Sequence, residues 1–148
     1  MTLEAVLASL HLLAVLTLVV FLSSQAALCR SEWLNAAVLE RLVRLELLCR
    51  IMMVAVLALG LVRVFWGVKG WSWYLSQPLL HLKLTLWAAV WLLSVPAARS
   101  FRRWRDQCQQ NGTLPTAPQV RRARQWVMVQ SHLLPVVAVV AVFWARGW

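Results

Sequence analysis

Four long apolar runs divide the chain, and the stretches between them hold most of its charged residues. A helix needs about 20 mainly apolar residues to cross the hydrocarbon core of a bilayer. The pattern predicts membrane spans over about residues 3–28, 46–66, 78–95 and 126–145. Because the connections are short, neighbouring spans should be antiparallel. We therefore expect an all-α membrane protein: a single four-helix transmembrane bundle with up-down-up-down topology.

Proline and glycine residues mark where these helices should begin and end. Pro78 suits the first turn of the third helix, where its missing N–H costs nothing. Pro96 is expected to close the same helix. Asn111-Gly112 then marks a turn within a basic connection over about residues 97–125.

Apolar side chains recur at helical spacing over residues 31–45, before the second span. This spacing predicts either an interfacial helix or an extension of the second span beyond the membrane. Glu46 and Arg50 follow at a spacing of four residues, which places them on one helix face, and we expect them to pair.

Composition agrees with a membrane protein and argues against two alternatives, a soluble domain and a nucleic-acid-binding protein. Hydrophobic residues make up 61% of the chain and charged residues 14%, with a mean hydropathy of +0.69. A soluble domain of 148 residues could not bury that much apolar surface. The net charge of +10 could indicate nucleic acid, but the basic residues lie between the apolar runs, without a basic face that carries a reading motif. The lipid bilayer is the expected partner, and no nucleic acid is expected.

The distribution of Lys and Arg predicts the orientation, because short cytoplasmic connections carry an excess of these residues. The first and third connections hold ten arginines, whereas the second connection and the termini hold Lys69 and Arg146, with Arg63 near the boundary. Both termini should therefore be extracytoplasmic. Aromatic belts at the two interfaces agree with this: Trp66, Trp71, Trp73, Tyr74, Trp144 and Trp148 outside, and Trp33, Trp104 and Trp126 inside.

The three cysteines, Cys29, Cys49 and Cys108, form no C-x-x-C pair and are expected to be reduced thiols. The first apolar run lacks a basic n-region and a small-residue cleavage site, so we expect a retained helix. The sequence has no Gly-rich phosphate loop, H-E-x-x-H zinc site or nucleophile with its base. Whether the protein is an enzyme stays open at this point.

Five ionisable residues lie inside the predicted spans: His11, Arg63, His81, Lys83 and His132. Such groups are costly in hydrocarbon, so each is by default a functional-site hypothesis.

The histidines admit two interpretations. At 1.5 Å per residue, His11 lies about 10 Å below the outer boundary and His81 about 5 Å below it. These depths are compatible with two imidazoles that approach one haem iron from either side. His132, about 10 Å deeper than His11, is the alternative second ligand. Each histidine could instead pack as a neutral imidazole, and His81 could simply be hydrated at the interface.

Lys83 and Arg63 also admit two interpretations. Each could extend to the outer headgroups. Alternatively, both point at an anion in the outer half of the bundle, such as the carboxylates of a ligand. His81 and Lys83 are about 200° apart around a helix and cannot both face the interior. Facing inward, Lys83 would share its face with Trp87 and Val90.

The second connection and its flanks carry a distinctive string. It consists of Gly60-Leu-Val-Arg-Val-Phe-Trp-Gly-Val-Lys-Gly-Trp-Ser-Trp-Tyr74, then Pro78, His81 and Lys83, with Leu93-Ser-Val-Pro96 and Phe101-Arg-Arg-Trp104 further on. This string resembles the bacterial four-span membrane proteins of domain of unknown function 2214, and the likeness covers essentially the whole chain. The resemblance implies a bacterial inner-membrane location with both termini periplasmic, and no established activity.

His11 and His81-Leu-Lys83 match a second layout. It is similar to that of HemJ-type protoporphyrinogen oxidases and, more loosely, CopD-like membrane proteins, which have a histidine in the first span. HemJ-type proteins also have a lysine early in the third span. The chain departs from HemJ-type proteins in its long Trp-rich second connection and its fourth span, so the resemblance is one of layout.

The HemJ-like layout implies a haem b or porphyrin site in the outer half of the bundle. His11, with His81 or His132, would hold the iron, and the propionates would pair with Arg63, Lys69 or Lys83. Two other functions stay open. The chain could be a non-catalytic accessory subunit of a larger membrane complex, or a homo-oligomer. It could also be a small CopD-like transporter, although its four methionines are scattered rather than clustered for Cu(I).

Overall fold

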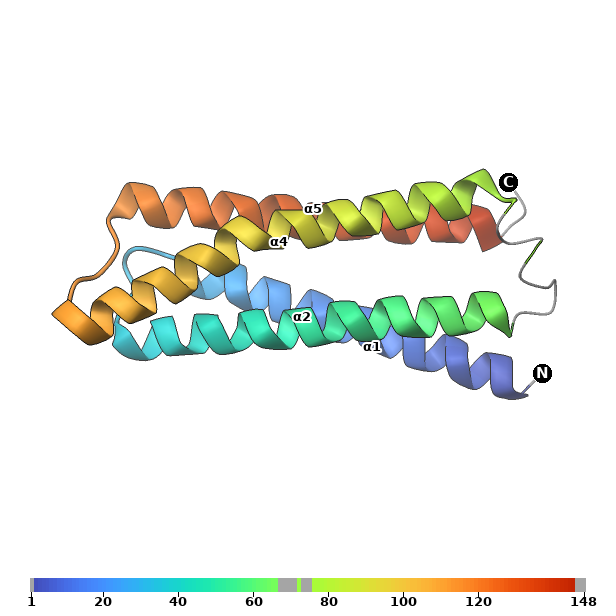
Figure 1. Cartoon of the computed structure of the whole chain (residues 1–148), viewed down its shortest axis with the longest axis horizontal. Helices are drawn as coiled ribbons and strands as arrows, with labels where there is room; N and C mark the ends of the chain where they lie inside the picture. Colours follow the sequence, from blue (N-terminus) through green and yellow to red (C-terminus); the bar gives the residue numbers. More distant parts are fainter. Residues whose placement is uncertain (1, 67–71, 73–75, 146–148) are drawn as a thin grey trace.

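The computed structural model describes residues 2–66, 72 and 76–145 (Figure 1). These residues form four long helices and no strand. The helices are α1 over Thr2–Leu28, α2 over Ala36–Phe65, α4 over Pro78–Asn111 and α5 over Ala117–Ala145. Each contains a stretch that is long and apolar enough to cross a membrane. The prediction of an all-α, four-helix membrane protein is confirmed.

Successive helices run antiparallel, and both chain termini lie at one end of the bundle (Figure 1). Helix α1 packs against α2 and α5, and α4 packs against the same two helices. We call the end that carries the termini the terminal end. The opposite end, with the connections 29–35 and 112–116, is the arginine-rich end, since its exposed residues include Arg30, Arg103 and Arg121.

Large apolar side chains cover the outer surface of the bundle. Leu13, Val20 and Leu92 are 58%, 59% and 69% exposed. In water such a surface would promote aggregation, whereas lipid tails are as apolar as leucine. Helix α4, with 34 residues, extends about 50 Å, well beyond a hydrocarbon core of about 30 Å. Because its arginines lie after Pro96, the surplus length projects at the arginine-rich end.

The expected end of the third helix at Pro96 is wrong, because α4 continues through this proline to Asn111. Proline removes one backbone hydrogen bond, but membrane helices tolerate it where neighbouring groups compensate. Residues 97–111 and 117–125 are therefore helical, and the predicted long basic loop reduces to residues 112–116. Gly112, with φ 66°, ends α4 at the predicted Asn-Gly turn.

Residues 36–45 belong to α2, so the extension of the second span, and not a separate interfacial helix, is observed. Asn35 starts the helix: its side chain accepts a hydrogen bond from the Val38 N–H at 2.9 Å. This contact satisfies one of the backbone donors that a helix start leaves without a partner.

Two apolar clusters fill the bundle from the arginine-rich end to its middle. The arginine-end core consists of Ala26, Cys29, Leu39, Leu42, Ala97, Phe101, Trp104, Val120, Ala123 and Val127. The central core consists of Leu18, Leu22, Cys49, Met53, Val56, Trp87, Val90, Leu134 and Val137. Among the described side chains, none of α1 before Leu18 and none of α5 after Val137 is buried. Helices α1 and α5 therefore pack closely at the arginine-rich end and loosely at the terminal end.

Trp104 does not lie in an interfacial belt, as the sequence suggested. It is 4% exposed and packs edge-to-face against Phe101, with ring centroids 5.7 Å apart. Trp33 is 53% exposed, as a belt residue should be. Of the expected outer belt, residues Trp71, Trp73, Tyr74 and Trp148 lie outside the described residues.

All three cysteines are free thiols, and Cys29 and Cys49 are buried. Burial raises the pKa of the Cys29 thiol, just beyond the end of α1, to about 11, against the opposing effect of the Arg124 charge. The thiolate is the reactive form, so Cys29 stays protonated and inert at neutral pH.

Phe101 is 0% exposed in the arginine-end core, so truncating it should leave a cavity. We expect Phe101→Ala to lower the free energy of unfolding by about 3–5 kcal/mol. Denaturant titration in detergent micelles would measure this loss. Leu92→Ala is the control, because Leu92 is 69% exposed and should contribute little. Equal losses in the two variants would contradict the assigned core.

Candidate functional site

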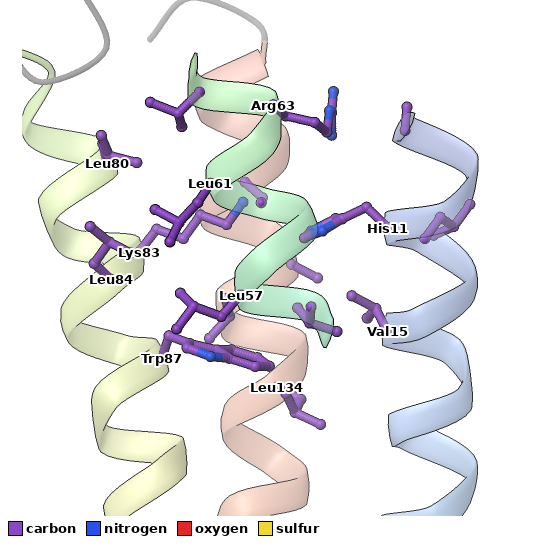
Figure 2. Close-up of a pocket in the computed structure, with 18 of the residues that line it drawn as sticks. His11, Val15, Leu57, Leu61, Arg63, Leu80, Lys83, Leu84, Trp87 and Leu134 are labelled. Carbon is purple, nitrogen blue, oxygen red and sulfur yellow. The ribbon is translucent and has the colours of Figure 1, made fainter. Parts of the chain in front are cut away.

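A cavity of about 300 Å³ lies among the four helices, on the side of the central core that faces the terminal end of the bundle (Figure 2). Its volume is at the lower end of the roughly 300–1,000 Å³ typical of small-molecule sites. The described residues that line it are aliphatic, apart from Gly60, Trp87 and the ionisable residues His11, Arg63 and Lys83. The cavity is thus an apolar pocket with a few polar groups.

His11 points from α1 toward α2 (Figure 2). Gly60 makes this approach possible, since a Cβ added there would already lie 3.4 Å from His11 Cε1. The Nδ1 atom of the imidazole is buried and has no hydrogen-bond partner. In a neutral imidazole one ring nitrogen donates and the other accepts, so Nδ1 can pair with a ligand in either tautomer.

Arg63 and Lys83 bring positive charge to the cavity from two neighbouring helices, α2 and α4. In Figure 2 Lys83 extends from α4 toward α2, and Arg63 lies nearer the terminal end. Both charges act on His11, and no acidic residue lines the cavity within the described part of the chain. The cavity therefore has a positive potential that favours anions. Trp87 and Val90 are buried, as expected if Lys83 faces inward.

Trp87 forms the floor of the cavity, where its indole lies below Lys83 (Figure 2). The residue is 8% exposed, and its Nε1–H is buried without a hydrogen-bond partner. Leaving such a donor unpaired costs about 1–3 kcal/mol. Trp87 thus offers a donor, and His11 a ring nitrogen, to a molecule in the cavity. Trp87 was not predicted as a site residue, although it is four positions from Lys83 on the same helix face.

Of the five predicted site residues, the structure brings together His11, Arg63 and Lys83. His81 and His132 are exposed and do not line the cavity. His132 Nδ1 instead lies 2.6 Å from the Met128 carbonyl oxygen, one turn earlier on α5. Lys69, the other expected propionate partner, lies outside the described residues.

The residues that line the cavity can supply one axial ligand to a haem iron rather than two. His11 is the one imidazole among the described lining residues. A second histidine ligand would require His81 or His132 to leave its exposed position. Nor do the described residues contain a group of three or more His, Cys, Asp or Glu side chains that could hold a metal ion.

Residues 3–148 match the family described as predicted membrane protein (DUF2214). The chain belongs to this family. The match confirms the resemblance seen in the sequence string that begins at Gly60, and it includes all four helices. No curated protein and no solved structure matches the chain. The likeness of this DUF2214 protein to HemJ-type and CopD-like proteins stays a prediction.

A second polar cluster of the DUF2214 protein lies on α1 and α2, between the arginine-end core and the central core. Glu46, 2% exposed, accepts hydrogen bonds from Arg50 Nε at 2.7 Å and from Gln25 Nε2 at 3.1 Å. The predicted Glu46–Arg50 pair is confirmed. Gln25 was not predicted, because it comes from α1 and a contact between helices leaves no spacing signal in the sequence.

This cluster ties α1 to α2 and is separate from the cavity. Gln25 and His11 are fourteen positions apart on α1, about 21 Å along the helix. The buried α1 positions between them include Leu18 and Leu22, which belong to the apolar central core. We therefore interpret the Glu46 cluster as a stabilising contact and the cavity as the candidate site.

Glu46→Ala should leave Gln25 and Arg50 without their acceptor. Because Gln25 is 1% exposed, we expect the free energy of unfolding to fall by about 1–3 kcal/mol. Thermal denaturation in micelles would show the loss as a lower Tm. Leu47→Ala, at a neighbouring position that is 54% exposed, should change Tm much less. A stable Glu46→Ala variant would contradict the interpretation.

Proposed function

We propose that this DUF2214 protein binds an amphiphilic anion within the bilayer, with the anionic group inside the cavity. One observation carries the proposal. A single apolar cavity combines the cations Arg63 and Lys83 with the Trp87 N–H donor and the buried, unpartnered His11 Nδ1, and no acidic residue lines it in the described chain.

The energetics of the membrane support this function. Charged residues inside membrane spans are rare, because they are costly in hydrocarbon. An anionic ligand would add a stabilising contact to Lys83, because hydrogen bonds between ionised groups are roughly twice as strong as neutral ones. Arg63 could add a two-pronged contact with a carboxylate or phosphate. The aliphatic walls would hold the apolar part of the ligand.

In a narrower form of this proposal, the amphiphilic anion is haem b or a porphyrin. Its propionates would pair with Lys83 and Arg63, and His11 would be the protein ligand of the iron. A bound haem would supply redox chemistry, which depends on such axial ligation. Purified protein would then show a Soret band that His11→Ala removes, whereas colourless protein would restrict the proposal to other amphiphilic anions. HemJ-like activity, docking on a larger membrane complex, self-association and CopD-like transport remain predictions.

Lys83→Gln should weaken the binding of a fluorescent long-chain fatty acid to the protein in lipid nanodiscs. Hydrogen bonds to charged groups contribute about 1.5–3 kcal/mol, so Kd should rise at least about tenfold. Leu82→Gln is the matched control, because it introduces the same side chain at a neighbouring position that is 44% exposed and does not line the cavity. Equal affinities in the two variants would contradict the proposal.

We also propose that the protein lies in a bacterial inner membrane with its terminal end in the periplasm. The support is the concentration of exposed arginines at the opposite end, as cytoplasmic connections require. The cavity would then open in the outer half of the bilayer.

This orientation predicts the labelling of intact cells by a membrane-impermeant maleimide. Cys108, partly exposed at the arginine-rich end, should react only after the membrane is disrupted. Ser76→Cys, introduced at an exposed position of the terminal end together with Cys108→Ser, should react in intact cells. The reverse pattern would mean the opposite orientation.

A further inference from the structure

Helices α1 and α5 are close at the arginine-rich end and separate toward the terminal end (Figure 1). Cys29 Sγ lies 3.9 Å from the Val120 carbonyl oxygen within the arginine-end core. Further along, Leu18 and Leu134 share the central core. Beyond that point neither helix has a buried residue among the described side chains, and Figure 1 shows the start of α1 moving away from α5.

We interpret this gap as the opening of the cavity. Leu12 on α1 and Val142 on α5 both line the cavity and are 58% and 59% exposed, whereas Leu61 on α2 and Leu84 on α4 are 39% and 37% exposed. Ala138, one turn before Val142, also lines the cavity and has a small side chain. These residues belong to apolar membrane-spanning segments. The opening therefore faces the hydrocarbon of the bilayer.

Two of the polar groups, Lys83 and Trp87, lie on the opposite side of the bundle from α1. Lys83 and Trp87 come from α4, which packs on α2 and α5 and lies diagonally across the bundle from α1. The edges of the opening, Leu12 and Val142, are aliphatic. A molecule that enters from the bilayer thus passes apolar side chains first and meets hydrogen-bonding groups inside.

We infer that the ligand is a single-chain carboxylic acid of the bilayer, whose head lies inside the cavity while its chain leaves sideways between α1 and α5. This inference rests on the proposed function and adds the class of ligand and its route. The two carboxylate oxygens match the donors of Lys83, Arg63 and Trp87. A cavity of about 300 Å³ needs to hold only the head and the first carbons of the chain.

The rest of the acyl chain stays in contact with lipid, so its surroundings are as apolar after binding as before. The affinity must then come from the head, and the shape of the opening decides which chains fit. A side chain that fills the opening should therefore exclude long acids and still admit short ones.

Two photoreactive probes test this route in vesicles that contain the full-length protein. Both carry a diazirine next to the carboxylate; one has a hexadecanoyl chain and the other a hexanoyl chain. Mass spectrometry would locate adducts on the buried lining residues Val56, Trp87 and Val137, which bulk lipid does not reach. Lys83→Gln should lower labelling of these residues by both probes.

Ala138→Phe should reduce labelling of the buried residues by the long probe about tenfold, because forcing a chain past an inserted ring carries an overpacking cost. Labelling by the short probe should persist, which also shows that the variant is folded. Val139→Phe, at a 53% exposed position that does not line the cavity, should leave both probes unaffected.

The outcomes separate the inference from the proposed function. Unchanged labelling by the long probe in Ala138→Phe would overturn the lateral route and leave anion binding intact. Labelling of wild-type protein by the short probe alone would overturn the long-chain ligand in the same way. If neither probe reaches the buried residues of wild-type protein, the inference fails, and the proposed function then depends on whether the purified protein shows the Soret band.

Discussion

Hydrocarbon contains no water to pair with polar groups, so every polar group inside this bundle must be satisfied by the protein or by a ligand. The backbone meets this requirement by forming helices. Glu46 meets it through Arg50 and Gln25. Four buried side-chain atoms among the described residues have no partner within the protein: Gln25 Oε1, Arg124 Nε, His11 Nδ1 and Trp87 Nε1. Only His11 and Trp87 of these residues line the cavity, where a ligand could reach them, and this position distinguishes the candidate binding site from the Glu46 cluster.

Packing also differs along the length of the bundle. From the arginine-rich end to the middle, two apolar cores and the Glu46 cluster hold the helices together. At the terminal end, α1 contributes no described buried side chain before Leu18, so nothing draws it against α5. A bundle that is firmly packed at one end can keep an open cavity at the other without losing its fold. Ligand sites between helices of a bundle commonly arise in this way.

Part of the candidate site could be predicted from the sequence. His11, Arg63 and Lys83 stand out because ionisable residues are rare in membrane spans. Their convergence was one of two alternatives that the sequence left open, since it depends on how three helices rotate and cross. Gly60 contacts His11 only because α2 packs on α1, and Trp87 becomes a site residue only because its N–H has no partner. His81 and His132 look equivalent to His11 in the sequence, yet both are exposed.

The sequence by itself determined the membrane location, the number of helices and the concentration of charge at one end, because these depend on local hydropathy and on residue counts. The prediction of a helix end at Pro96 was wrong, because local backbone chemistry favoured an end there but packing of α4 sustained the helix. Only the tertiary structure decided which polar residues face one another and where the bundle stays open. These properties depend on contacts between residues far apart in the chain, which the spacing of residues within a single helix does not predict.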